Sequence, residues 1–128
     1  MSSKSKINNV SLILSLLALT IALFGCGRKE QEKYGQKISN YAATDIGEIL
    51  KNAEDFNGKT VTVQGEISRE CPAGCWFNLK ESSAEIYVDL NPSAFAIPQK
   101  VGKNVTVEGK VSISNNQTMI VGTGVEIK

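Results

Sequence analysis

The chain of 128 residues contains no histidine. That absence excludes histidine-ligated zinc, haem with an axial histidine, histidine-based copper sites and every catalytic arrangement that needs an imidazole. Charge of one sign is also lacking, since 14 Lys and Arg stand against 13 Asp and Glu. Proteins that bind duplex nucleic acid need clustered positive charge, so we expect no nucleic-acid partner.

Other elements of catalytic chemistry are missing as well. We find no carboxylate pair in a plausible cleft, no glycine-rich phosphate cradle and no activated serine. The sequence therefore favours a binding or assembly module over an enzyme, and it indicates no obligatory cofactor.

The chain has one long uncharged apolar run, Val10–Phe24, which follows Lys4 and Lys6. Its 15 residues fall short of the about 20 that a membrane-spanning helix needs. A basic start followed by a short apolar run is typical of a secretory signal peptide, and we assign residues 1–25 to one.

The run ends in the tetrapeptide Leu23-Phe24-Gly25-Cys26. This ending resembles the lipobox of bacterial lipoproteins. The resemblance implies that Cys26 becomes the first residue of the mature protein and carries lipid, which anchors the chain to a membrane. It also implies a location in the cell envelope, facing the periplasm or the exterior.

The segment that follows, residues 27–40, is charged and polar. We interpret residues 26–43 as a lipidated, solvated tether and residues 44–128 as one small domain. The domain begins with a short helix that Thr44 or Asp45 can cap and that Asn57-Gly58 ends. One face of this helix carries its apolar residues, Ile46, Ile49, Leu50 and Ala53.

After the helix, the segment 58–68 returns as the similar segment 102–112. In each copy valines alternate with polar residues, as in a half-buried strand. Each copy also has a glycine on the inward phase, Gly65 or Gly109, which is typical of a bulge, a sharp coil or a close backbone approach in a small barrel.

Three more alternating runs, Trp76–Glu81, Glu85–Leu90 and Thr118–Ile127, bring the expected strands to five. The alternation places these residues of the three runs inward: Phe77, Leu79, Ile86, Val88, Leu90, Met119, Val121, Val125 and Ile127. The domain resembles the exported bacterial OB-fold family, with Val-x-Val-x-Gly-x-Ile in the first strand and Trp-Phe-x-Leu in the second. We therefore expect an all-β, five-stranded OB-fold-like Greek-key barrel with a short N-terminal helix.

In an OB-fold the loops Ser68–Gly74 and Ser114–Gln117 would flank the ligand-binding face. The first loop leads into the pair Cys71 and Cys75, whose chemistry has three readings. The pair could form a local disulfide that fixes the loop. It could hold Cu(I), since Cys-Pro-x-x-Cys resembles the copper-binding loop of Sco-type assembly proteins, with Met119 as a third donor if that residue faces the loop. It could also be redox-active, with Arg69 favouring the thiolate and Glu70 opposing it.

The outward phase of the second and third strands places Trp76 and Asn78 beside Tyr87. These aromatic rings could form a stacking platform for a ligand, or a cross-strand contact that only steadies the sheet. With Arg69, they are the candidate ligand-binding residues. We expect a lipid-anchored binding module that presents residues 71–76 to an envelope protein or a small ligand. The alternative is a thiol-dependent Cu(I) or redox carrier that uses Cys71 and Cys75.

Overall fold

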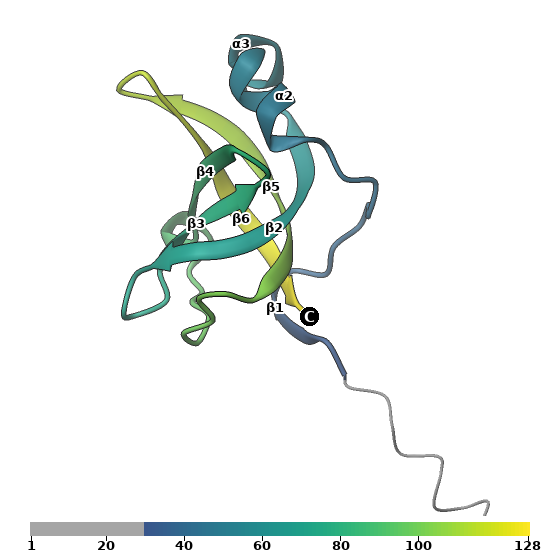
Figure 1. Ribbon diagram of the computed structural model, residues 1–128, viewed down its shortest axis with the longest axis vertical. Coiled ribbons are helices and arrows are strands. Elements are labelled where there is room, and N and C mark those ends of the chain that lie inside the picture. The colour runs from purple at the N-terminus through teal and green to yellow at the C-terminus, as the bar shows by residue number, and fades with distance from the viewer. Residues whose placement is uncertain (1–29) are drawn as a thin grey trace, which may run out of the picture. The chain divides into compact units, whose positions relative to one another are not determined.

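The computed structural model describes residues 30–128, and Figure 1 shows their arrangement. The predicted signal peptide and the predicted lipidation site Cys26 lie outside the described residues. The elements in chain order are β1 (Glu32–Gly35), α2 (Ile46–Lys51), α3 (Ala53–Phe56), β2 (Thr60–Glu70), β3 (Trp76–Glu81), β4 (Ala84–Asp89), the 3-10 turn η2 (Asn91–Ser93), β5 (Asn104–Ser114) and β6 (Gln117–Ile127). Within this part of the chain, no helix has the length and apolar character needed to cross a membrane.

Strands β2 to β6 close into a five-stranded barrel. Strand β2 pairs with both β3 and β5, β5 pairs with β6, and β6 returns parallel to β4. This order and the single parallel pair are the connectivity of an OB-fold. The predicted fold class is therefore confirmed.

Strand β2 pairs with one neighbour along its first half and with another along its second half, because it bends sharply between the two. Its first half, Thr60–Glu66, pairs with β5, and from Glu66 onward it pairs with β3. Gly65 stands at this changeover, where a Cβ would lie 2.5 Å from the carbonyl oxygen of Lys80. The expected close backbone approach at this glycine is thus present.

The barrel interior is filled by branched and aromatic side chains. Each fully buried side chain of this size stabilises the fold by about 1.5–3 kcal/mol relative to leaving it exposed. Barrel residues that are fully buried include Val63, Ile67, Phe77, Leu79, Val88, Leu90, Val107, Val111, Ile120 and Val125.

Helices α2 and α3 cover one end of the barrel (Figure 1). The Asp45 carboxylate caps α2 by accepting the N–H of Glu48 at 3.2 Å, as predicted. Ile46 and Ile49 enter the core, whereas Leu50 is 38% exposed, so its expected place on the buried face is wrong. The single predicted helix is divided in two because Asn52 leaves helical geometry (φ −122°, ψ 40°).

The solvated tether predicted for residues 26–43 is wrong from Glu32 onward. Strand β1 pairs antiparallel with the end of β6, and Gln36 N–H donates to the Thr123 carbonyl at 2.8 Å. Ile38 is 2% exposed. This segment is attached by backbone pairing to the edge of β6 and by the packing of Tyr34 and Ile38, and it belongs to the same compact unit as the barrel.

The predicted inward phase of the last strand holds only for its second half. Val125 and Ile127 are buried, but Ile120 enters the core in place of Met119 and Val121, which are only partly buried. The cause is a bulge: Glu108 pairs with Gly124 while Gly109 pairs with Gly122, so Thr123 is an extra residue. One inserted residue reverses which side chains face the core.

Candidate functional site

The connection between β2 and β3 is a tight loop bounded by the two cysteines. Gly74 N–H donates to the Cys71 carbonyl at 2.8 Å, and Cys71 N–H donates to the Trp76 carbonyl at 2.9 Å. Both bonds close the loop on itself. Strand β2 runs on to Glu70, so the loop is shorter than predicted and Arg69 belongs to the strand.

The two sulfur atoms of this loop are in contact. Cys75 Sγ lies 2.6 Å from Cys71 Sγ, and both side chains are partly exposed. A disulfide bond is about 2.05 Å long. Two thiolates that share a tetrahedral metal ion through bonds of about 2.3 Å lie about 3.7 Å apart. The two cysteines are free in this structure, so the predicted local disulfide is not shown, and their sulfur atoms lie closer together than two ligands of one ion would.

The two cysteines differ in their electrostatic surroundings. The hydrogen bond between the two thiols, with the backbone N–H groups of residues 73–75, lowers the pKa of Cys71. The same hydrogen bond, together with burial, raises the pKa of Cys75. Cys71 is therefore the thiol that ionises first, although no helix begins at the loop to assist it.

Next to this loop, the outer face of the barrel carries the predicted aromatic pair. The rings of Trp76 and Tyr87 stand 5.5 Å apart at an interplanar angle of 32°. Asn78 pairs with Tyr87 in the β3–β4 ladder and with Arg69 in the β2–β3 ladder. The structure thus brings these four candidate residues together on one surface, which we call the aromatic face.

Met119 is a further member of the aromatic face. The sequence does not predict this place for it. It pairs with Tyr87 in the parallel β4–β6 ladder, and Val121 pairs with Asp89 two residues further on. Met119 therefore lies on the outer surface rather than in the core as predicted. Figure 1 shows the β5–β6 turn, which contains Asn115 and Asn116, and the cysteine loop beyond opposite ends of β3 and β4.

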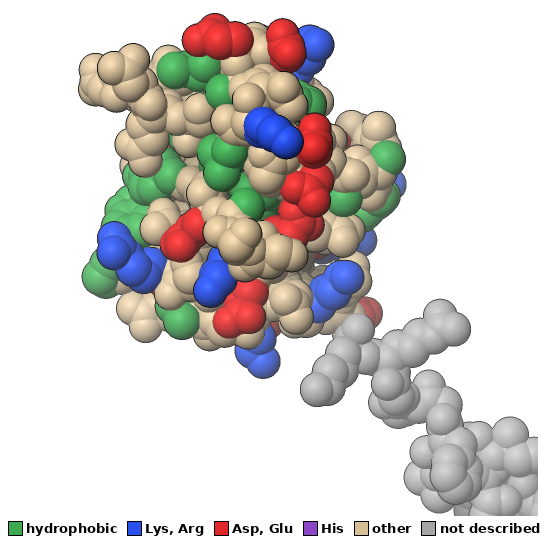
Figure 2. Space-filling view, turned by 45° about the horizontal axis from the view of Figure 1, so that its top comes forward, with side chains coloured by type: hydrophobic (Ala, Val, Ile, Leu, Met, Phe, Trp, Pro, Cys, Tyr) green, Lys and Arg blue, Asp and Glu red, His purple; other side chains and the backbone are tan. Residues whose placement is uncertain are grey.

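Charges of both signs surround the aromatic face. Asp89 and Lys80 stand on β4 and β3, and Ser68 Oγ donates to the Glu85 carboxylate at 2.6 Å, which lowers the pKa of that carboxyl. Burial, followed by the charges of Asp89 and the two cysteines, raises the pKa of Tyr87. On the face drawn in Figure 2, acidic and basic side chains are likewise interspersed.

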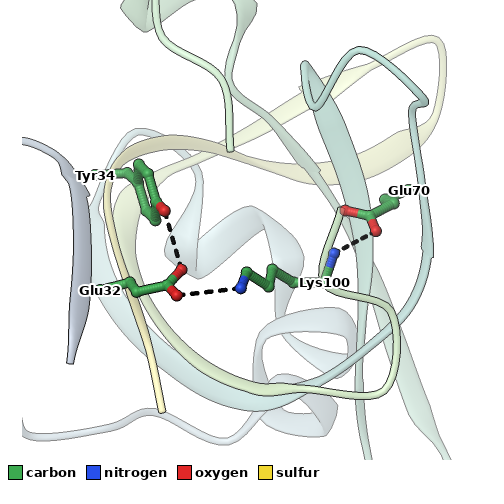
Figure 3. A network of polar contacts seen from close by, with 4 residues as sticks. All are labelled: Glu32, Tyr34, Glu70 and Lys100. Carbon is green, nitrogen blue, oxygen red and sulfur yellow. Dashed lines mark hydrogen bonds and ion pairs between the residues drawn. The ribbon is translucent and has the colours of Figure 1, made fainter. Parts of the chain in front are cut away.

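A polar network behind the cysteine loop was also missed by the sequence reasoning (Figure 3). The Glu70 carboxylate accepts the backbone N–H groups of Lys100 and Val101 through one oxygen, and its second oxygen is buried without a hydrogen-bond partner among the described residues. Lys100 Nζ pairs with Glu32 at 3.1 Å, and Glu32 accepts the Tyr34 hydroxyl at 2.9 Å. Glu70 therefore fixes the base of the loop and does not simply oppose a thiolate.

No protein-family model and no curated protein matches the sequence significantly. A solved structure, the hypothetical protein ygiW from E. coli, has a TM-score of 0.49 and 18% identity, and the match covers 74% of this chain and 100% of that one. The OB-fold assignment stands on the strand order and register described above.

Proposed function

We propose that this protein is a binding module of the bacterial cell envelope, which engages its partner through the aromatic face and the adjoining loop of residues 71–76. The observation that carries the proposal is the tilted aromatic pair Trp76 and Tyr87 on the outside of the barrel. Both side chains are only partly buried, so ring surface remains for a partner.

The composition of the face limits the partner. Aromatic rings in contact contribute about 0.5–1.5 kcal/mol beyond the area that they bury. Asp89 and Glu85 stand beside the rings and disfavour an anionic ligand, whereas Arg69 and Asn78 offer hydrogen-bond donors. A protein side chain or a neutral small ligand fits this combination.

Anchoring by lipid on Cys26 would hold the aromatic face at a membrane surface. The proposal rests on the Leu-x-Gly-Cys ending of the apolar run. The start of β1 supports a short link, because five residues separate Cys26 from Glu32 and span at most about 18 Å.

The proposal is tested by site-specific photo-crosslinking in cells that express the full chain. A photoreactive phenylalanine analogue replaces Asn78 on the aromatic face or, as a matched control, the exposed Lys51 on α2. We expect a discrete adduct from position 78 alone, and Trp76→Ala should lower its yield by about tenfold through loss of about 1.4 kcal/mol. Equal adducts from both positions, or an adduct that Trp76→Ala leaves unchanged, would refute the assignment of this face.

The competing class is a thiol-dependent carrier of Cu(I) or of electrons, whose function would depend on Cys71 and Cys75 and not on a partner bound at the aromatic face. Replacing both Cys71 and Cys75 with serine separates the two classes. A binding module keeps its position-78 adduct at reduced yield, because the partner still meets the rings. A carrier loses its binding of Cu(I) or its transfer of electrons entirely, because the two sulfur atoms that would perform either task are gone.

A further inference from the structure

We infer that Cys71 and Cys75 form a dithiol–disulfide exchange site, in which Cys71 supplies the sulfur that attacks a disulfide of a protein partner. This inference adds a chemical step to binding. It rests on the proposed function only in the choice of partner, which the aromatic face would hold against the loop.

The loop is built so that the two sulfur atoms can join without disturbing the barrel. The atoms are already 2.6 Å apart, and a bond requires them to approach by only about 0.5 Å. Glu70 holds the start of the loop and Leu90 N–H donates to the Cys75 carbonyl at 3.0 Å at its end. Both cysteine side chains nevertheless reach the surface, where a substrate can meet them.

The sulfur atoms are in contact and either thiol can donate its hydrogen to the other, so the contact alone does not assign the two roles. The backbone N–H groups of residues 73–75 assign them, because they favour negative charge on Cys71 and lower its pKa, while the pKa of Cys75 is raised. A thiolate is the attacking species in exchange, and the second thiol must ionise only after the first bond has formed.

The reaction balances without a further reagent. The Cys71 thiolate attacks one sulfur of the substrate disulfide, forms a mixed disulfide and expels the other substrate sulfur as a thiolate. Cys75 then gives its proton to water, and its thiolate attacks the Cys71 sulfur and expels the second substrate thiolate. The pair has lost two electrons and closed as a disulfide, and the substrate has gained two electrons as two thiolates, which take up protons from water to become thiols.

The position of the aromatic face explains why the substrate would be a protein disulfide. Trp76 directly follows Cys75 in sequence and contacts Tyr87 in a tilted ring pair, and the cysteines are close enough to Tyr87 to contribute to its raised pKa. A polypeptide that packs on these rings therefore brings its own atoms to the two sulfurs. Small, strongly anionic disulfides would gain nothing from a face that carries Asp89 and Glu85.

The test uses the reduced full chain carrying Cys26→Ser, so that only two thiols are counted, with the aromatic disulfide dithiobis(nitrobenzoate) as probe. With both loop cysteines present, we expect two equivalents of thionitrobenzoate to be released and a protein two hydrogens lighter that retains no adduct. Cys75→Ser, whose hydroxyl can still donate to Cys71, should release one equivalent and keep one adduct. Cys71→Ser should react at least about threefold more slowly than Cys75→Ser at pH 7.

A protein that keeps two adducts and forms no internal disulfide would overturn the exchange site, and equal rates for the two single variants would overturn the assigned roles. A disulfide-linked peptide serves as the second probe, compared between the parent chain and Trp76→Ala. Slower exchange with the peptide alone in that variant supports recognition by the aromatic face. If Trp76→Ala slows exchange equally with both probes, or slows it with neither probe, recognition by the aromatic face is refuted. The exchange chemistry itself is then judged by the results with dithiobis(nitrobenzoate).

Discussion

The backbone of Gly74 lies directly against that of Ile97 and joins the cysteine loop to the connection between β4 and β5. Ile97 N–H donates to the Gly74 carbonyl at 3.1 Å. Gly74 is buried and has φ +74°, and a Cβ built on it would overlap the Ile97 carbonyl oxygen. The position thus requires glycine both for its backbone angle and for its lack of a side chain.

Gly74→Ala should therefore destabilise the domain by about 2 kcal/mol or more, since the left-handed conformation alone costs a non-glycine residue about 1–2 kcal/mol and the overlap adds strain. Urea unfolding monitored by Trp76 fluorescence measures the change. Gly102→Ala is the matched control, because Gly102 also has positive φ (+84°) but no heavy atom within 4 Å of the added Cβ. Equal losses of stability in the two variants would show that the Ile97 contact contributes nothing.

Glu108→Gln should release the segment that precedes α2. The Glu108 carboxylate is only 9% exposed and accepts the N–H and hydroxyl of Ser39 and the N–H of Asn40. The side-chain amide of glutamine places its own N–H group opposite one of these N–H or O–H donors. We therefore expect the free energy of unfolding to fall by about 1–3 kcal/mol. Urea unfolding measures the loss of stability. Faster hydrogen exchange of the backbone amides of residues 39 and 40 would show that this segment is the part released.

Glu54→Gln on the exposed surface of α3 controls for the loss of one negative charge. It should leave both measurements unchanged. If Glu108→Gln leaves the exchange rates at residues 39 and 40 as they are, the carboxylate does not hold the segment.

The barrel interior could be predicted from sequence because inward side chains recur at every second position of its strands. The expected exposure of the opposite phase is wrong at Thr62 and Glu108, which are buried because the segment before α2 binds them. Val61 and Val63 alternate with polar residues, and the same alternation in β3 and β4 places Phe77 and Leu79 inside and Trp76 outside. The same alternation predicts that Trp76 and Tyr87 lie on one outer surface, which the structure confirms. Where a strand is regular, the period of its apolar side chains is enough to predict which of them face the barrel interior.

Features that depend on backbone pairing could not be predicted. Strand β1 has the sequence Glu-Lys-Tyr-Gly, in which Tyr34 is the one large apolar group, and its pairing with β6 adds backbone bonds that leave no mark in the side-chain pattern. The bulge at Thr123 reverses the phase of half a strand. Gly109, Gly122 and Gly124 border it, so the glycines indicate where a bulge can form, but not which strand takes the extra residue. The alternation therefore predicts Met119 in the core, whereas the residue lies beside Tyr87.

The attachment of β1 should weaken in acid. Hydrogen bonds from Lys100 and then from Tyr34 hold the pKa of Glu32 below its ordinary value of 4.5. A carboxyl whose pKa is lowered by folding contributes stability above the unfolded value, and the contribution is lost as pH falls through the folded value. Amide chemical shifts of residues 33–35 should therefore move toward unpaired values below about pH 4.5.

Glu32→Gln provides the reference for this titration, since it removes the ionising group and weakens the pairing with Lys100. In that variant the shifts should be displaced at neutral pH and should change little between pH 5 and pH 3. A variant that titrates like the parent chain would assign the acid transition to another carboxyl.

Lipid attachment at Cys26 can be tested independently of the barrel. If Cys26 carries acyl chains, the chain should sediment with membranes and incorporate labelled palmitate, because burial of each methylene contributes about 0.8 kcal/mol. Cys26→Ser should abolish the label and either release the domain or leave it with an uncleaved signal peptide, a difference that intact mass resolves. Cys71→Ser is the matched control, because it removes a cysteine while leaving the Leu-x-Gly-Cys ending intact. Palmitate incorporation that survives Cys26→Ser would place the anchor elsewhere in the chain.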